Sequence, residues 1–324
     1  MQGAENDVAT RQVRSMRIGL ALAIFAAATF GTSGIFGSSL IDAGWSPAAA
    51  VLARISIAAV VLTVPALLQL RGRWAVLRAS ARPAVAYGLI AVAGCQLFFF
   101  NAISHMQVGV ALLIEYLGPI LVVGWLWLRH GQRPRRLTVT GAIAAMAGLA
   151  LVLDVFGSAR INPVGTMWAL LAAAGLATFF VLSAAHGEQL PPVVMAWAGL
   201  CVGAVTLGTL GLTGLVPIRA MAVRVQLAGH QVSWVVPVLG LSVIAAAIAY
   251  LAGIGAARRL GAKLASFVSM AEVLFAIVFA WLLLGQLPGL PQFAGGALIL
   301  AGVTLVRLDE LRAGPPAGLV VSSP

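Results

Sequence analysis

The sequence is short of charge. Only 9% of the 324 residues are charged, whereas a soluble domain carries about 25%. Hydrophobic residues make up 61% of the chain, and the mean hydropathy is +1.03. A water-exposed surface needs more charge than this, so the composition excludes a cytosolic enzyme, a secreted disulfide scaffold and a disordered chain. A multi-pass membrane protein is the class that remains.

Motifs of catalysis and cofactor binding are also missing. The chain has no H-E-x-x-H, G-x-S-x-G, G-x-x-x-x-G-K-[ST] or C-x-x-C pattern, which argues against a membrane-embedded enzyme and an ATP-driven pump. The four histidines show no spacing typical of metal ligands. Cys95 and Cys201 fall within apolar stretches and are expected to pack as small residues. We therefore expect neither a metal nor a cofactor.

Long apolar stretches, in contrast, fill the chain. A helix needs about 20 apolar residues to cross the hydrocarbon core of a bilayer. We predict an all-α integral membrane protein with ten transmembrane helices, over Ile18–Ile41, Ser46–Leu70, Pro83–Ser104, Val108–Leu128, Leu137–Leu153, Pro163–Ala185, Pro191–Ile218, Trp234–Ala257, Leu264–Leu284 and Pro291–Val306.

Basic residues give an independent count, because short cytoplasmic loops retain arginine and lysine. With the N-terminus inside, 16 of the 20 basic residues fall in cytoplasmic segments, three on the opposite face and Arg54 within a helix. We therefore predict that both termini are cytoplasmic. The net charge of +11 lies in loops that face anionic headgroups, so no nucleic-acid partner is expected. Arginine outnumbers lysine 19 to 1, which is typical of a GC-rich bacterium and indicates its inner (plasma) membrane.

The chain contains an internal repeat. A shift of 154 residues places Leu117–Val152 over Ala271–Val306 without a gap, with ten of 36 positions identical. The match includes Trp127-Leu128 with Trp281-Leu282 and Gly131 with Gly285. We predict two five-helix repeats at residues 18–155 and 163–308, with cytoplasmic tails at 1–17 and 309–324. Because five is odd, the second repeat enters the membrane from the opposite face, which is the architecture of an alternating-access carrier.

These motifs resemble those of a known family. Two halves that each close on a W-L-x-x-G-Q turn and an A-G-x-x-L-V helix resemble the EamA domains of the drug/metabolite transporter superfamily. The segment from Glu115 to Pro119 and the segment Ser269-Met270-Ala271-Glu272 are most similar to the branch of threonine/homoserine exporters. Two departures bear on the substrate. Members often have Glu-Pro where Glu272 precedes Val273, and tryptophan within the sixth helix, where Leu176–Phe180 has none.

Three charged residues are predicted to lie within the membrane: Arg54, Glu115 and Glu272. A charge at that depth costs roughly 2.5–3.5 kcal/mol and usually faces a cavity or a partner. Arg54 and Glu115 lie at similar predicted depths, so they form an ion pair that only orders the helices, or Arg54 grips a substrate carboxylate. Glu272 lies on the other side of the midplane. It couples protonation to substrate exchange, or its carboxylate is simply capped by Ser269 or by neighbouring backbone groups.

Uncharged residues are further candidates for the site. Pro119 cannot donate to the Glu115 carbonyl, so a kink is expected that either frees this group or only aids packing. Candidate cavity residues are Gln96, Asn101, Tyr116, Tyr250 and Ser269, although buried polar side chains often only bridge helices.

The resulting hypothesis is a secondary transporter of a small organic metabolite, an exporter of amino acids or related compounds. The alternatives are a membrane-embedded enzyme and a channel or scaffold. A channel needs rings of charged or carbonyl groups around an axis, and three lone charges suit a single central site better. The predicted partners are a small-molecule substrate, protons and the lipid bilayer; the oligomeric state is left open.

Overall fold

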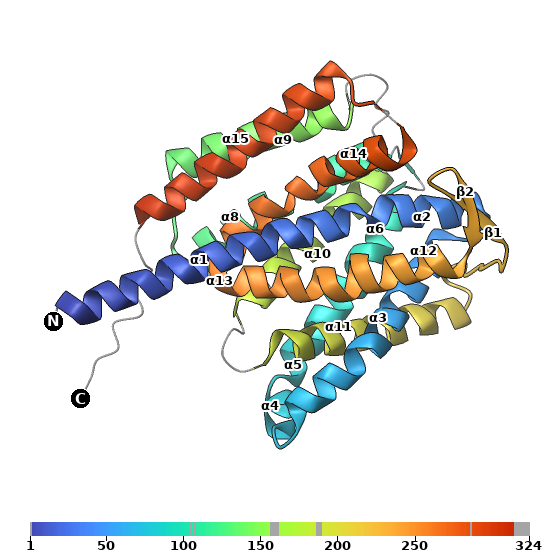
Figure 1. Cartoon of the computed structure of the whole chain (residues 1–324), viewed down its shortest axis with the longest axis horizontal. Helices are drawn as coiled ribbons and strands as arrows, with labels where there is room; N and C mark the ends of the chain where they lie inside the picture. The colour runs from blue at the N-terminus through green and yellow to red at the C-terminus, as the bar shows by residue number, and fades with distance from the viewer. Residues whose placement is uncertain are drawn as a thin grey trace.

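The computed structural model describes residues 2–103, 105–106, 108–155, 162–185, 190–285 and 287–313. Helices dominate, and α1 begins at the end of the bundle where α15 finishes (Figure 1). The elements are α1 (Gln2–Gly31), α2 (Ser33–Asp42), α3 (Pro47–Leu70), α4 (Trp74–Ala79), α5 (Ala81–Ala86), η1 (Tyr87–Gly94), α6 (Cys95–Ile103), α7 (Val108–Glu115), α8 (Gly118–His130), α9 (Arg136–Val152), α10 (Pro163–Ala185), α11 (Pro192–Leu212), β1 (Arg224–Leu227), β2 (His230–Ser233), α12 (Val235–Leu239), η2 (Gly240–Ile248), α13 (Ala249–Ser269), α14 (Ala271–Leu284) and α15 (Leu290–Ala313).

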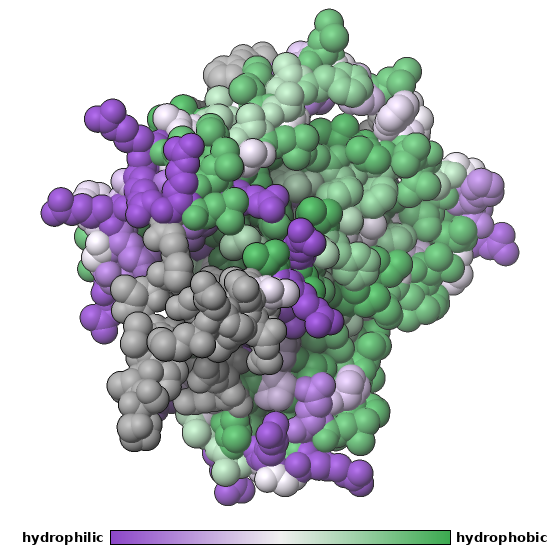
Figure 2. Space-filling view, turned by 60° about the vertical axis from the view of Figure 1, so that its left-hand side comes forward, coloured by the Kyte–Doolittle hydropathy of each residue, from purple (hydrophilic) through white to green (hydrophobic). Residues whose placement is uncertain are grey.

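Eight described helices are long and apolar enough to cross a membrane. They span Val13–Asp42, Pro47–Leu70, Ala81–Ile103, Val110–His130, Pro163–Ala185, Pro192–Leu212, Val235–Ser269 and Leu290–Arg312. Two further apolar helices, Arg136–Val152 and Ala271–Leu283, are shorter. Hydrophobic residues cover much of the face in Figure 2, with hydrophilic residues gathered towards its margins. The chain is therefore a multi-pass membrane protein.

Several helix boundaries differ from those predicted. The helical segment Val235–Ser269 joins the predicted eighth helix to the start of the ninth, and its backbone breaks at Gly261, where φ is 77°. The seventh helix ends at Leu212 instead of Ile218. Helix α1 begins at Gln2 and α15 continues to Ala313, so the described parts of both predicted tails are helical.

A β-hairpin is the one described departure from helical structure, and the prediction of an all-α protein missed it. Strands β1 and β2 pair antiparallel, with Leu227 opposite His230. Ala228 and Gly229 form the loop with φ values of 48° and 82°, as a two-residue hairpin turn requires. Val225 is buried against Trp45 in a cluster at this end of the bundle, so the hairpin covers the end opposite to the start of α1 (Figure 1).

Irregular features recur at the 154-residue spacing found in the sequence. The π-helices η1 and η2 end at Gly94 and Ile248. The helix breaks that follow are equally related, because α7 ends at Glu115 and α13 at Ser269. The next helices both end on a left-handed glycine, Gly131 with φ 68° and Gly285 with φ 69°. The two repeats therefore share backbone irregularities as well as identical residues.

Helices α9 and α15 are the most extensively packed pair, and they lie side by side at one edge of the bundle (Figure 1). Small residues allow their backbones to approach. A Cβ on Gly141 would lie 2.7 Å from the Gly302 carbonyl oxygen, and one on Gly295 would lie 2.5 Å from the Gly148 carbonyl oxygen. Since Gly141 contacts Gly302 while Gly148 contacts Gly295, the two helices run antiparallel.

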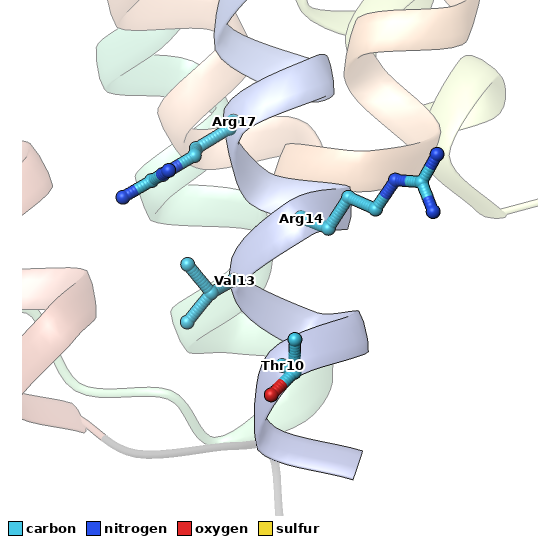
Figure 3. Close-up of a pocket in the computed structure, with 4 residues that line it drawn as sticks. All are labelled: Thr10, Val13, Arg14 and Arg17. Carbon is cyan, nitrogen blue, oxygen red and sulfur yellow. The ribbon is translucent and has the colours of Figure 1, made fainter. Parts of the chain in front are cut away.

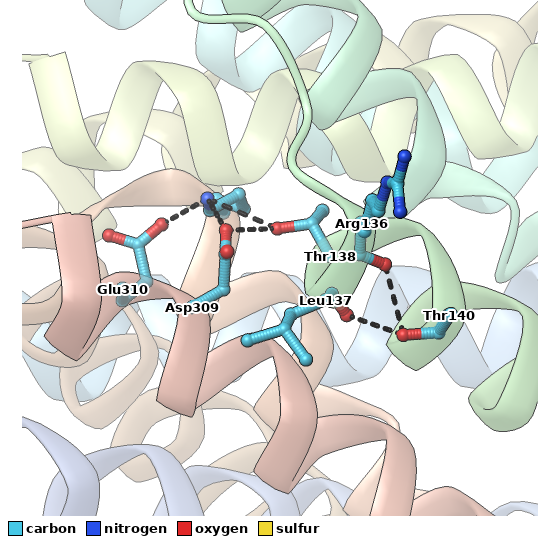
Figure 4. Close-up of polar contacts among 7 residues, drawn as sticks. Arg136, Leu137, Thr138, Thr140, Asp309 and Glu310 are labelled. Atoms are coloured by element: carbon cyan, nitrogen blue, oxygen red, sulfur yellow. Dashed lines mark hydrogen bonds and ion pairs between the residues drawn. The ribbon is translucent and has the colours of Figure 1, made fainter.

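A polar cluster ties this pair to α13 (Figure 4). Thr138 of α9 donates a hydrogen bond of 2.6 Å from its Oγ1 to Asp309 Oδ2 of α15. Lys263 Nζ lies 3.5 Å from the same oxygen and also forms an ion pair with Glu310. Asp309 is only 2% exposed. This residue was assigned to the C-terminal tail, yet it is buried between helices.

Candidate functional site

Arg54 lies on α3 and is buried, with 8% of its surface exposed. Its Nη2 donates a hydrogen bond of 2.6 Å to the Ala245 carbonyl oxygen, and its guanidinium carbon lies 5.7 Å from the centroid of the Phe30 ring. Ala245 belongs to η2, where the π-helical turn alters the usual backbone pairing. The Nε of Arg54 is buried without a hydrogen-bond partner. Arg54 is therefore anchored and retains one donor for an incoming group.

Glu115 is the last residue of α7, at the first helix break. The Cys95 thiol donates to its Oε1 over 3.3 Å, and Cys95 is the residue at which η1 passes into α6. Pro119, the second residue of α8, has no N–H for the Glu115 carbonyl. The chain therefore breaks at the point where this partly buried carboxylate is placed.

Glu272 lies in the first turn of α14, just beyond the second helix break. Arg54 is close enough to interact with it electrostatically, and the Tyr116 hydroxyl faces its carboxyl group. Helix α1 packs closely here, because a Cβ on Gly31 would lie 2.9 Å from the Glu272 carbonyl oxygen.

The three predicted charges thus come together from α3, α7 and α14, but not in the arrangement that their depths indicated. Within 4.0 Å, Arg54 and Glu115 form no ion pair; the ion pairs among the described residues are those of Lys263. Arg54 instead uses a backbone carbonyl, and its electrostatic partner is Glu272. Tyr250 of α13 also lies within electrostatic reach of Arg54 and both carboxylates.

Aromatic rings line this charged cluster. The Tyr250 ring lies 5.5 Å from Phe30 and 5.7 Å from Phe179, and Phe179 meets Phe180 edge to face at 4.9 Å. Sequence reasoning did not assign Phe30, Phe179, Phe180 or Cys95 to the site. The sequence did offer one indication for Phe179 and Phe180: they lie in Leu176–Phe180, where members of the EamA family often have a tryptophan.

A narrow cavity with a volume of about 20 Å³ lies beside this cluster. Glu272 and Ser269 supply its polar lining, and Phe30, Phe179 and Phe180 much of its apolar lining. Pockets that hold small ligands usually measure about 300–1,000 Å³. This cavity is therefore too small for an organic solute, and the helices around it must move apart to admit one.

The remaining predicted residues lie further along α6. Asn101 donates from its Nδ2 to the Leu97 carbonyl oxygen over 2.8 Å, and its own carbonyl lies 2.8 Å from His105 Nδ1. Gln96 is partly buried and follows Cys95 directly. These contacts do not bring Asn101 into the charged cluster.

A larger hollow of about 350 Å³ lies elsewhere, on the first turns of α1. Its described lining residues are Thr10, Val13, Arg14 and Arg17, which lie along a single helix (Figure 3). All four are exposed. This hollow lacks the buried, convergent groups that distinguish the cluster around Arg54.

A helical bundle with two repeats and a buried charged site defines a multi-pass membrane protein of the transporter class. The model of the EamA-like transporter family matches the chain twice, at residues 17–154 and 163–308. The chain therefore belongs to this family.

Individual proteins agree with this assignment. An uncharacterized inner membrane transporter, YicL, of Salmonella typhimurium is 25% identical over 92% of this chain and 98% of its own length. A probable terminal-alkyne amino-acid exporter of Streptantibioticus cattleyicolor is 27% identical over 83% of this chain and 86% of its own. One solved crystal structure, 22% identical, superimposes with a TM-score of 0.75 over 92% of this chain and 99% of its own, and shares the fold.

Proposed function

We propose that this protein is a secondary carrier that exports amino acids or related small metabolites by alternating access. The observation that carries the proposal is the meeting of Arg54, Glu115 and Glu272 within the bundle, beside a narrow cavity. Such groups are costly in a membrane interior and mark substrate or ion pathways. A relative named as a probable amino-acid exporter supports the substrate class.

The proposed mechanism needs two oppositely inserted repeats. The antiparallel packing of α9 against α15 supports this arrangement, because the shift of 154 residues converts Gly141 into Gly295 and Gly148 into Gly302. Exchanging the two repeats thus maps each glycine contact onto the other. Equivalent antiparallel helices are related by a two-fold axis perpendicular to them, which for membrane-spanning helices lies in the membrane plane, as in inverted repeats.

We further propose that α9 and α14 complete ten membrane crossings, with repeats at 18–155 and 163–308 and both termini in the cytoplasm. The position of the start of α1 and the finish of α15 at one end of the bundle supports an even number of crossings. The excess of arginine in the loops at that end supports a cytoplasmic location.

Proton exchange at the paired carboxylates is the proposed driving force. Glu115 and Glu272 interact electrostatically, so a change in the protonation of one alters the environment of the other. Arg54 takes the substrate carboxylate through its buried Nε, while Tyr116, Tyr250 and Ser269 line the path. The helix break at Glu115 and Pro119 lies in the segment that resembles threonine/homoserine exporters. We therefore propose that the protein belongs to this branch and that its substrates resemble those of the branch.

Counterflow into proteoliposomes tests this function. Liposomes that contain the purified full-length protein are loaded with one unlabelled amino acid at a time, and uptake of the same labelled compound is followed. A carrier gives saturable uptake that is stimulated by internal substrate. Uptake that rises linearly with concentration indicates a channel, and chemical conversion of the compound indicates an enzyme; either result overturns the proposal.

A further inference from the structure

A second group of polar residues lies away from the three charges, at the end of the bundle where α1 begins. It consists of Tyr87 of η1, Ser183 of α10 and Arg258 of α13. Tyr87 and Ser183 are both 0% exposed. The mechanism proposed above uses none of them, and Arg258 lies one residue beyond the predicted eighth helix, Trp234–Ala257.

Each member of this group has a buried polar atom without a hydrogen-bond partner. These atoms are the Tyr87 hydroxyl oxygen, the Ser183 Oγ, and the Nε and Nη2 of Arg258. Leaving such groups unpaired is costly in a protein interior. The three residues lie together, because Tyr87 interacts with the Ser183 side chain and electrostatically with Arg258. Buried donors from three separate helices therefore converge.

The identity of the free atoms on Arg258 indicates the ligand. Nε and Nη2 form one edge of the guanidinium fork, and two parallel N–H groups on such an edge match the two oxygens of a carboxylate. Tyr and Ser hydroxyls add neutral donors. The two cations that follow Arg258 in sequence are both engaged: Arg259 donates to the Gly255 carbonyl oxygen, and Lys263 interacts with Asp309 and Glu310.

The group is connected to the central site by aromatic rings. The Tyr87 ring lies 5.7 Å from Phe179, which in turn lies 5.7 Å from Tyr250. Ser183 follows Phe179 by one helical turn, and Arg258 follows Tyr250 by two turns, or about 12 Å. The polar group thus lies between the central cavity and one end of the bundle.

We infer that Arg258, Tyr87 and Ser183 form a carboxylate-binding subsite on the path between the central site and the bundle end at which α1 begins. The carboxylate belongs to the transported solute, and this part of the inference rests on the proposed carrier function. The subsite receives the carboxylate before Arg54 does, or after Arg54 releases it. Each solute therefore passes between Arg258 and Arg54, along the rings of Tyr87, Phe179 and Tyr250.

Anion-dependent stability of the purified full-length protein tests the subsite without knowledge of the solute. The temperature of thermal unfolding is measured against increasing sodium acetate, with sodium phosphate and sodium chloride as parallel titrations at the same ionic strength. A bound anion stabilises the folded state in proportion to its occupancy. We expect a saturable rise with acetate, and a smaller response to the other two salts.

Variants locate the response. Arg258→Lys keeps the charge but loses the fork, and Tyr87→Phe removes one donor, so each raises the acetate concentration for half-maximal effect by about tenfold. Arg259→Gln is the matched control, because Arg259 is the exposed neighbour and its Nη1 already donates to the Gly255 carbonyl oxygen; it should retain the wild-type response. Tyr87→Phe also provides a test if Arg258→Lys does not fold.

Three outcomes overturn the inference: no response to acetate, a response in Arg258→Lys and Tyr87→Phe that equals that of the wild type, or a response to phosphate without one to acetate. The last outcome indicates a lipid headgroup instead. Counterflow separates this inference from the carrier function. Saturable transport without an acetate response removes the subsite alone, whereas an acetate response that depends on Arg258, without counterflow of any solute, removes the carrier alone.

Discussion

The two helix breaks at the centre of the molecule have the same position in their repeats but carry their carboxylates on opposite sides. In the first repeat, Glu115 ends the helix before the break. In the second, Ser269 holds the equivalent position, and Glu272 lies in the helix after the break. The partial charge of a helix terminus is negative at its C-terminal end and positive at its N-terminal end. A shared backbone thus places two carboxylates in different electrostatic surroundings.

This difference indicates how a duplicated fold obtains one asymmetric site. Glu272 faces Arg54, whereas Glu115 receives a thiol hydrogen bond from Cys95. The backbone irregularities come in equivalent pairs, but each charged group occurs in one repeat only. Four predictions test this division between symmetric scaffold and asymmetric chemistry.

The largest expected effect concerns Glu272. Glu272→Gln removes the charge that interacts electrostatically with Arg54 and leaves Arg54 without it at a depth where a charge costs roughly 2.5–3.5 kcal/mol, so we expect transport to fall by about 100-fold. Glu115→Gln keeps an acceptor for Cys95 and should reduce transport less. The measurement is the initial rate of counterflow. Asp154→Asn, at an exposed turn with φ 49°, is the control. Dependence on a proton gradient that is unchanged in Glu272→Gln contradicts proton coupling at this residue.

The symmetric scaffold predicts matched losses of stability. Gly148→Ala and Gly302→Ala, at equivalent positions of the two repeats, each bring a methyl group against a carbonyl oxygen of the facing helix, and overpacking of this kind costs about 1–3 kcal/mol. Both should lower the unfolding temperature by similar amounts. Gly124→Ala, where a Cβ meets no atom within 4 Å, is the control. A large loss in one variant alone contradicts the proposed two-fold relation.

Lys263 has no counterpart, because position 109 of the first repeat is glycine. Lys263→Gln leaves the buried Asp309 without its cation, and we expect a loss of stability of about 1–2 kcal/mol. Lys263→Arg should restore most of it. The measurement is again thermal unfolding of the purified protein. If the Gln and Arg variants unfold together with wild type, the cluster in Figure 4 does not stabilise the contact between α13 and the α9–α15 pair.

The smallest effect is expected at the paired left-handed glycines. Gly131→Ala and Gly285→Ala place a Cβ on backbones with φ near 68°, at a cost of about 1 kcal/mol each. Gly34→Ala, in open helix surface, is the control. If the two variants unfold at different temperatures, the equivalent turns contribute unequally to the stability of the folded protein.

Much of this architecture was predictable from sequence because it depends on hydropathy and on glycine. Apolar length located most membrane helices, and the matched Gly131 and Gly285 marked turns whose backbone favours that residue. The π-helices were not predictable, since an i→i+5 turn has no hydropathy signature that distinguishes it from an α-helix.

The site was predictable only in part. Arg54, Glu115 and Glu272 were identified by the cost of burying charge, and the structure brings them together. Their partners were not found because a backbone carbonyl such as that of Ala245 exists at every residue. Asp309 was missed because it follows the last predicted apolar stretch, Pro291–Val306, where a carboxylate is expected to be solvated. The β-hairpin was missed because its strands contain only four residues each.

One serine joins the two repeats at the end of the bundle covered by the hairpin. Ser46 accepts from the Ala49 N–H at the start of α3, and its hydroxyl donates to the Pro217 carbonyl oxygen while accepting from the Arg219 N–H. The helix that carries Arg54 therefore starts on a residue fastened to a connection in the other half. If either half were expressed alone, the contacts of Ser46 with Pro217 and Arg219 would be lost. Co-expression of the other half as a separate polypeptide would restore them.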